Sequence, residues 1–286
     1  MLVDRIDAVE EAVDADAQDG RTKRTAAGRL LALLDAFTNA GGALTLSELS
    51  RYAGLSLTTT HRLVREVLAW GGLQVDDHGR YRLSSKFVEL VSASNEGMRL
   101  REAALPHLME LHRRIGRTTV HLAIREGASM MYLDALRSYP NYTGESRMGG
   151  HLPLHATAAG MVLLAHTSED FIEEYLSTPL QRFTPYTVVD PVELQDLLAT
   201  IRAERYFVYP RSMVMDGGGI AAAIVEDGSA VKAVVNAVWL IDQQDPERLT
   251  PLVRATANRI SRILAGPRPP LHPRTIDFNR RRAGLI

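Results

Sequence analysis

The 286-residue chain contains no cysteine, so thiol catalysis, iron–sulfur clusters, cysteine zinc sites and disulfide bonds are all excluded. It also lacks any apolar run near the roughly 18 residues that a membrane-spanning helix needs. Its first residues are acidic, whereas a secretory signal would begin with basic residues. We therefore expect a soluble, cytoplasmic protein that makes no contact with a membrane.

The net charge of −1 conceals an uneven distribution along the chain. Residues 1–20 carry seven acids and one Arg, residues 21–86 carry ten bases and five acids, and residues 87–286 carry 22 of each. A basic stretch inside a neutral chain is typical of a nucleic-acid-binding module, although a merely solvated basic face would look the same. The length predicts two domains, at roughly 100–200 residues per domain.

Three helices are predicted in the basic segment. Apolar residues recur at spacings of three and four over residues 24–37, which describes one buried helix face. The run Thr45-Leu46-Ser47-Glu48 is a capping box that begins a second, short helix, and Gly54 closes this helix. Ser56 or Thr58 caps the third helix. Two helices joined by a tight turn form a helix-turn-helix, whose second helix can enter the major groove of DNA.

The third helix carries side chains that suit DNA. Hydroxyl groups, an imidazole and cations cluster near its N-terminus, where the helix dipole is also positive. Alternation over residues 73–83 predicts a β-hairpin wing with Arg on its exposed side. We expect this segment to bind duplex DNA, and the alternative is a small helical domain with solvated Arg side chains. The candidate DNA-binding residues are Thr45, Ser56, Thr58, Thr59, His61, Arg62, Arg65, Arg80 and Arg82.

The remainder of the chain predicts a mixed α/β domain. Alternating runs predict paired strands at residues 118–124 and 130–136, and again at 220–225 and 230–240, with helices between them. Small residues begin a helix shortly after Pro153, and the open N–H groups of such a helix start favour an anion such as a carboxylate.

A connecting helix is expected over residues 85–99, and its exposed apolar residues favour dimerisation. The next helix is expected at residues 103–115, with Pro106 in its first turn. We expect residues 1–22 to form an acidic, disordered tail and residues 267–286 to form a Pro- and Arg-rich, mobile tail.

Several motifs resemble one family of bacterial transcription factors. Leu44-Thr45-Leu46-Ser47-Glu48-Leu49, Thr59-Thr60-His61-Arg62-Leu63 and Gly79-Arg80-Tyr81-Arg82-Leu83 look like the DNA-binding domain of the isocitrate lyase regulator (IclR) family. Pro153-Leu154-His155-Ala156-Thr157 is similar to a hallmark of its effector domain. The resemblance implies an α+β fold. Its parts are a winged helix-turn-helix domain at residues 23–84, a linker helix at 85–99 and a GAF-like mixed α/β effector-binding domain at 100–266.

The resemblance also implies an effector site. In the family, backbone amides equivalent to those of Ala158 and Ala159 receive the effector's carboxylate. Three positions depart from the family pattern, because a frequent Cys is Gly219, a frequent acid is Tyr209, and a Ser-x-Ser is Asn236-Ala237-Val238. These changes favour a larger, more apolar ligand, such as an aromatic acid, over glyoxylate or pyruvate. The candidate effector-binding residues are His155, Ala158, Ala159, Gly160, Tyr209, Gly219, Ile220, Asn236 and Val238.

No motif for catalysis, a metal or a cofactor is recognised. His151 and His155 flank Pro153, so they cannot share a regular helix face, and Gly144-Glu145-Ser146-Arg147-Met148 lacks the last Gly of a serine hydrolase motif. We predict a non-enzymatic, ligand-responsive repressor of a catabolic operon, which senses a small organic acid and binds a palindromic operator as a homodimer or homotetramer. The alternatives are an enzyme tethered to a DNA-targeting module and an architectural DNA-binding protein.

Overall fold

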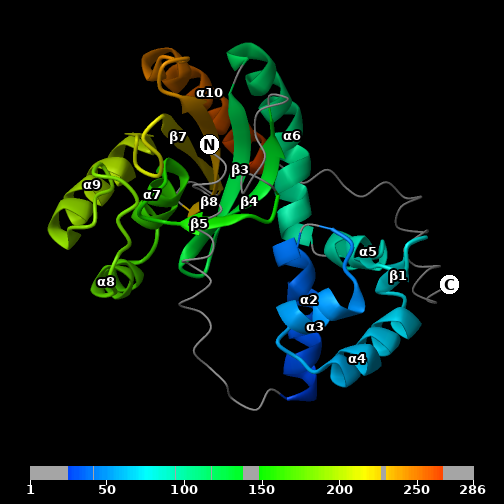
Figure 1. The fold of residues 1–286 in the computed structure, drawn as a ribbon. Helices are drawn as coiled ribbons and strands as arrows, with labels where there is room; N and C mark the ends of the chain where they lie inside the picture. The colour runs from blue at the N-terminus through cyan, green and yellow to red at the C-terminus, as the bar shows by residue number, and fades with distance from the viewer. Residues whose placement is uncertain are drawn as a thin grey trace. The chain divides into compact units, whose positions relative to one another are not determined.

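The computed structural model describes residues 25–40, 42–93, 95–116, 118–137, 148–226 and 230–266 (Figure 1). The described chain divides into two compact units, one up to Arg99 and one from Leu100 onward. The tails that we expected at residues 1–22 and 267–286 lie outside the described residues.

The N-terminal unit consists of helices and a β-hairpin. Helices α2 (Ala26–Ala40), α3 (Leu46–Tyr52) and α4 (Leu57–Trp70) pack on one another, and β1 (Leu73–Val75) pairs antiparallel with β2 (Tyr81–Leu83). This order is the predicted winged helix-turn-helix. The buried residues of its core are Leu33, Ala36, Phe37, Leu44, Leu49, Ala53, Leu63, Val64, Val67 and Leu73.

Local sequence sets the ends of α3 and α4. Thr45 forms the predicted capping box with Glu48 at the start of α3. Of the two candidates for the start of α4, Ser56 is the cap. Gly71 ends α4 with a φ of 86°, a left-handed conformation that favours glycine.

The wing is joined to the start of α3 by backbone hydrogen bonds. Leu44 N donates to Tyr81 O at 2.8 Å, and Tyr81 N donates to Leu44 O at 2.7 Å. Leu44 directly precedes the residue that caps α3, so the second strand of the wing and the beginning of the helix-turn-helix are held together.

The helical connection differs from the prediction. One helix was expected over residues 85–99, but α5 (Lys86–Ala93) is followed by α6 (Asn95–Ile115), which continues through the region where a separate helix was expected. Pro106 therefore lies inside α6 and not in a first turn. A proline there leaves the carbonyl of Glu102 without its helical donor, but both residues are exposed, so water can replace the missing bond.

The C-terminal unit is built on one antiparallel sheet of six strands. The strands are β3 (Thr119–Glu126), β4 (Ser129–Leu136), β5 (His151–Pro153), β6 (Tyr206–Pro210), β7 (Gly217–Glu226) and β8 (Ala230–Leu240). Their order in the sheet is β5-β4-β3-β8-β7-β6. The two predicted strand pairs, β3 with β4 and β7 with β8, are present, and the short strands β5 and β6 were not predicted.

Helices cover both faces of this sheet (Figure 1). One core joins the sheet to α7 (Ala158–Ala165), α8 (Glu169–Ser177) and α9 (Pro191–Glu204), and a second core joins it to α6 and α10 (Pro246–Leu264). Successive residues of a strand belong to different cores, as the pleat requires: Ala221 lies in the first and Ile220 in the second. The unit is therefore an α+β fold with two cores.

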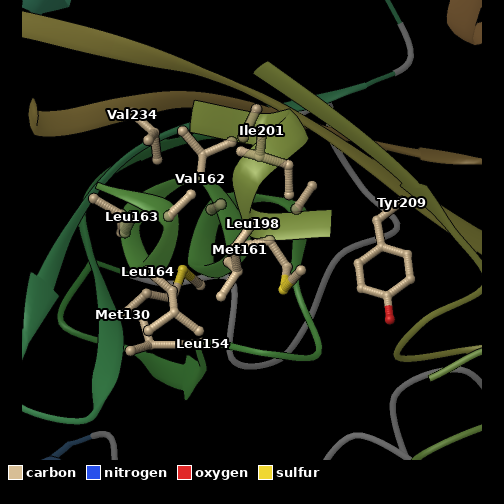
Figure 2. Close-up of a cluster of buried hydrophobic side chains, with 14 of the residues drawn as sticks. Met130, Leu154, Met161, Val162, Leu163, Leu164, Leu198, Ile201, Tyr209 and Val234 are labelled. Atoms are coloured by element: carbon tan, nitrogen blue, oxygen red, sulfur yellow. The ribbon is translucent and has the colours of Figure 1, made fainter. Parts of the chain in front are cut away.

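Helix α7 is buried along its whole length and approaches its neighbours closely. A Cβ atom at Gly160 would lie 2.3 Å from the carbonyl oxygen of Leu154, a contact that no side chain tolerates. Figure 2 shows α7 residues such as Met161 and Leu164 among the side chains of this core. The glycine therefore places the first turn of α7 against the backbone that precedes it.

Candidate DNA-binding surface and ligand site

Helix α4 presents one exposed face. Leu63, Val64 and Val67 turn to the core, and positions i, i+3, i+4 and i+7 of a helix share a face. Four of the predicted DNA contacts occupy such positions, and all four are exposed. We call these residues the α4 stripe: Thr58, His61, Arg62 and Arg65. Hydroxyl and guanidinium groups on one accessible face can reach base edges and phosphates together.

The two Arg residues of the α4 stripe differ in their partners. Arg62 Nη1 lies 2.9 Å from Glu66 Oε1, one helical turn away, and both side chains are exposed. Arg65 makes no ion pair within the described part of the chain. Arg65 is therefore the more available of the two cations.

Three other predicted DNA contacts make hydrogen bonds at the N-termini of α3 and α4. Thr45 Oγ1 accepts from Glu48 N at 3.3 Å and donates to Glu48 Oε2 at 2.9 Å. Ser56 Oγ accepts from Thr59 N at 3.3 Å and donates to Thr59 Oγ1 at 2.9 Å. These hydroxyl groups satisfy backbone donors that α3 and α4 would otherwise leave open.

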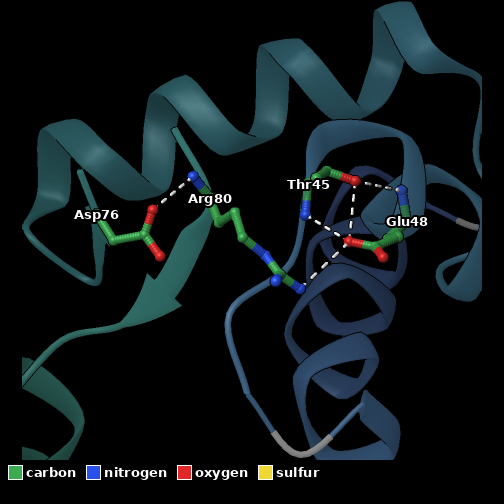
Figure 3. A network of polar contacts seen from close by, with 4 residues as sticks. All are labelled: Thr45, Glu48, Asp76 and Arg80. Atoms are coloured by element: carbon green, nitrogen blue, oxygen red, sulfur yellow. Dashed lines mark hydrogen bonds and ion pairs between the residues drawn. The ribbon is translucent and has the colours of Figure 1, made fainter. Parts of the chain in front are cut away.

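The wing contributes Arg80 and Arg82. The backbone N of Arg80 donates to Asp76 Oδ1 at 2.9 Å, and its guanidinium lies 3.8 Å from Glu48 Oε2, as Figure 3 shows. The backbone and the hydroxyl of Thr45 lower the pKa of Glu48, so this carboxylate stays ionised. Arg82 is exposed. Sequence analysis missed the contact between Glu48 and Arg80, because no local pattern relates a capping box to a wing.

The start of α7 carries two open main-chain donors. Thr157 caps the helix, and its Oγ1 accepts from Gly160 N at 2.9 Å. Met161 N donates to Thr157 O at 2.9 Å. The amides of Ala158 and Ala159 are buried and have no acceptor in the described residues. Two buried donors at the positive end of a helix dipole can receive a carboxylate.

A row of residues crosses the sheet beside this helix start. The strand register aligns Tyr209, Gly219, Val238 and Thr119 on β6, β7, β8 and β3, and we call them the sheet row. A Cβ atom at Gly219 would lie 3.2 Å from Ala158 Cβ and 3.8 Å from Ala158 N, so this glycine lies directly at the start of α7.

Solvent reaches the middle of the sheet row. Gly219 and Val238 are paired across β7 and β8, and both are partly exposed. The residues immediately before and after each of them are buried. The face of the sheet is therefore accessible at this pair, next to the open amides of α7.

A buried polar pair adjoins the sheet row. Asn236 Nδ2 lies 3.3 Å from His121 Nδ1, and its Oδ1 would lie 3.9 Å from a Cβ atom at Gly219. An amide nitrogen can only donate, so His121 Nδ1 is the acceptor. His121 also stacks on Tyr132 with ring centroids 4.0 Å apart. Sequence analysis missed Thr119 and His121, and the register of β3 on β8 is the signal that identifies them.

Tyr209 forms the other end of the sheet row. Its ring is buried, and in Figure 2 its hydroxyl points away from the cluster around α7. The hydroxyl accepts from Val188 N at 2.8 Å. Burial raises the pKa of Tyr209, so the side chain remains neutral. Tyr209 therefore contributes an uncharged aromatic ring to this end of the sheet row.

The structure places two candidate effector contacts, Ile220 and His155, away from the sheet row. Ile220 follows Gly219 in β7, so the pleat turns its side chain into the opposite core, with α6 and α10. The ring of His155 is buried and fully partnered: Nδ1 lies 2.9 Å from the Tyr175 hydroxyl and Nε2 lies 2.8 Å from Gln181 O. The amide of Gly160 is likewise occupied, by Thr157.

Neither a membrane span nor a metal cluster is found in the described ranges. Their helices are all too short or too polar to cross a bilayer. Their His, Asp and Glu residues form no group that could hold a metal ion. His151, considered above for a metal site, has its Nδ1 3.0 Å from the hydroxyl oxygen of Ser129.

Comparison with known proteins gives matches over most of the chain. The family described as IclR helix-turn-helix domain matches residues 26–77, and the family described as bacterial transcriptional regulator IclR C-terminal matches residues 93–262. The transcriptional repressor AllR of Salmonella typhimurium strain LT2 is 30% identical over 248 residues, which are 85% of this chain and 90% of AllR. The transcriptional regulator XynR of Escherichia coli K12 is 34% identical over 183 residues, which are 62% of this chain and 71% of XynR.

Solved structures agree with these matches. An IclR homologue from Microbacterium hydrocarbonoxydans, crystallised in complex with 4-hydroxybenzoate, is 32% identical. It aligns with a TM-score of 0.78 over 84% of this chain and 99% of its own. The helix-turn-helix, the two-sided sheet and these matches together establish that the chain belongs to the IclR family of bacterial transcriptional regulators.

Proposed function

We propose that this chain is a repressor without catalytic activity, and that a small aromatic carboxylic acid bound at the start of α7 releases it from operator DNA. The observation that carries the ligand part is the pair of buried, open amides at Ala158 and Ala159, next to the accessible Gly219 and Val238. AllR is a repressor and the Microbacterium homologue binds 4-hydroxybenzoate, which supports both halves of the proposal.

The proposed contacts follow from the chemistry of the site. The amides of Ala158 and Ala159 donate to the carboxylate, and the helix dipole stabilises its charge in a buried place. Gly219 has no side chain, so it leaves space for the ligand beside these amides. A side chain at this position would contact Ala158 closely. Val238 and Tyr209 supply apolar walls, which favour an aromatic ring over a two- or three-carbon acid. Asn236 supplies a polar group at the edge.

The proposed DNA contacts are the α4 stripe and the wing. Thr58, at the start of the recognition helix, would read base edges, while Arg62, Arg65 and Arg82 would contact phosphates. We propose that two copies bind a palindromic operator, because a symmetric dimer with one recognition helix per copy matches a two-fold symmetric site. The genes under its control would be those that degrade the acid.

The variant Ala158→Pro tests the ligand site. Proline lacks the N–H donor, yet it suits the first position of a helix, as Pro191 in α9 and Pro246 in α10 demonstrate. Thr157 already has the extended backbone that precedes proline, with φ −123° and ψ 148°. We expect the wild type to gain several degrees in melting temperature with millimolar 4-hydroxybenzoate, and Ala158→Pro to lose this gain while remaining folded.

Glu169→Pro is the matched control, since Glu169 holds the first position of α8 after Ser168, which has the same extended backbone. It should keep the full response to the acid. A wild type that responds to neither 4-hydroxybenzoate nor benzoate would contradict the proposed ligand class. An unaltered response in Ala158→Pro would contradict the proposed site.

A further inference from the structure

Thr119, the first residue of β3, is a polar residue in a buried position. Its side chain is fully buried, and its Oγ1 has no hydrogen-bond partner among the described residues. Buried polar atoms in proteins are nearly always hydrogen-bonded, and an unpaired one costs stability. Valine has the same shape without this cost, so the hydroxyl indicates a partner that binds from outside the chain.

Thr119 faces the ligand site. It alternates with Val120, which lies in the core with α6 and α10, so Thr119 points to the opposite face, where α7 packs. It also directly pairs with Val238 in the sheet row. Thr119 is therefore the buried neighbour of the accessible pair, on the side of Val238 away from Gly219.

The spacing along the row matches a ring with two polar ends. Gly219 and Thr119 are two strands apart, which corresponds to about 10 Å between their backbones. The carboxylate end is fixed at the start of α7 beside Gly219. Val238, between the two, offers an apolar side chain against which a benzene ring can pack. A substituent opposite the carboxylate on such a ring would extend toward Thr119.

We propose that Thr119 selects aromatic acids that carry a hydroxyl group opposite the carboxylate. The proposal rests on the proposed function of the site at α7. A threonine hydroxyl can both donate and accept, so it suits a ring hydroxyl. The row contains no Lys or Arg, so it offers no fixed positive charge to a second carboxylate at this end, and burying such a carboxylate is unfavourable.

The experiment compares two acids that differ only in this group. Isothermal titration calorimetry measures 4-hydroxybenzoate and benzoate on the wild type, Thr119→Val and Thr119→Ser. The wild type should bind 4-hydroxybenzoate about tenfold more tightly than benzoate, which is the usual effect of one buried hydrogen bond. Thr119→Val should bring the two affinities together, and Thr119→Ser should keep the preference.

The outcomes separate this proposal from the one before it. If both acids bind the wild type and Thr119→Val keeps the preference for 4-hydroxybenzoate, the ligand site stands and the role of Thr119 is overturned. The same holds if the wild type shows no preference, because the ring hydroxyl then gains no affinity from Thr119. If neither acid binds, the proposed function itself fails. Should Thr119→Val not fold, Thr119→Ala against Thr119→Ser gives the same comparison.

Discussion

Gly160 lies in the first turn of α7 and Gly219 lies beside that turn, and they illustrate two uses of a missing side chain. At Gly160 a Cβ atom would strike the backbone of Leu154, so the glycine permits close packing. At Gly219 a Cβ atom would press on Ala158, but the residue is partly exposed. The space at Gly160 is filled by the protein, whereas Gly219 is partly exposed to solvent.

His155 gives a prediction for the pH dependence of stability. Burial lowers the pKa of this residue below its ordinary value of 6.5. As the pH falls below about 6.5, the unfolded chain therefore takes up a proton before the folded chain does, and the folded state loses stability. We expect the free energy of unfolding to fall between pH 7.5 and 5.5, and to fall less steeply in His155→Gln.

Urea denaturation at several pH values measures this slope. The slope will not vanish in the variant, because burial also lowers the pKa of His107, His112 and His166. Equal slopes in wild type and His155→Gln would contradict the assignment of a buried, neutral ring to His155.

At the scale of elements, the sequence predicts best where the signal is local. The capping box at Thr45 and the glycine at Gly54 mark the two ends of α3 through contacts within a few residues, and both predictions hold. Strands β5 and β6 are only three and five residues long, and pairing with β4 and β7 creates them. So short a pattern carries too little periodicity to be recognised.

The ligand site shows the same limit. Resemblance to the family predicted Ala158, Gly219 and Asn236, and the structure brings these three together. His121 lies 115 positions from Asn236 in sequence, so only the register of β3 on β8 brings the two together. The strand pattern also could not tell that Ile220 faces the other core, because both faces of this sheet are covered and apolar.

The α4 stripe gives a prediction for DNA affinity. Arg65 has no ion pair in the described chain, whereas Arg62 is paired with Glu66. We expect Arg65→Ala to weaken binding to all DNA sequences and to reduce the slope of log affinity against log salt by about one. Arg62→Ala should have a smaller effect, because its charge is already partly neutralised.

Fluorescence anisotropy with a labelled duplex at several salt concentrations measures both slopes. Arg113→Ala is a suitable control, since this exposed Arg of α6 is paired with Glu110 and lies in the other unit. A salt slope in Arg65→Ala equal to that of the wild type would count against the α4 stripe as a DNA surface.

At the scale of the whole molecule, a regulator needs its two binding events to affect each other. Linkage requires that the acid and the DNA change each other's affinity by the same factor, typically about 5- to 150-fold. We expect saturating 4-hydroxybenzoate to lower the affinity for DNA, and saturating DNA to lower the affinity for 4-hydroxybenzoate equally. Anisotropy and calorimetry on the same preparation measure the two factors.

Two variants should each affect one of the two binding events and leave the other intact. Ala158→Pro should bind DNA normally but no longer respond to the acid, while Arg65→Ala should bind the acid normally but hold DNA weakly. An acid that leaves DNA affinity unchanged in the wild type would show that the site at α7 has no part in regulation.

The backbone bridge between Leu44 and Tyr81 affects which DNA sequences the protein prefers as its operator. Because the wing is hydrogen-bonded to the beginning of α3, the distance between the recognition helix α4 and the wing is fixed. A duplex whose groove spacing does not match this distance has to bend or twist in order to contact both elements. Flexible base steps between the contacted positions would then improve binding, although no side chain touches them.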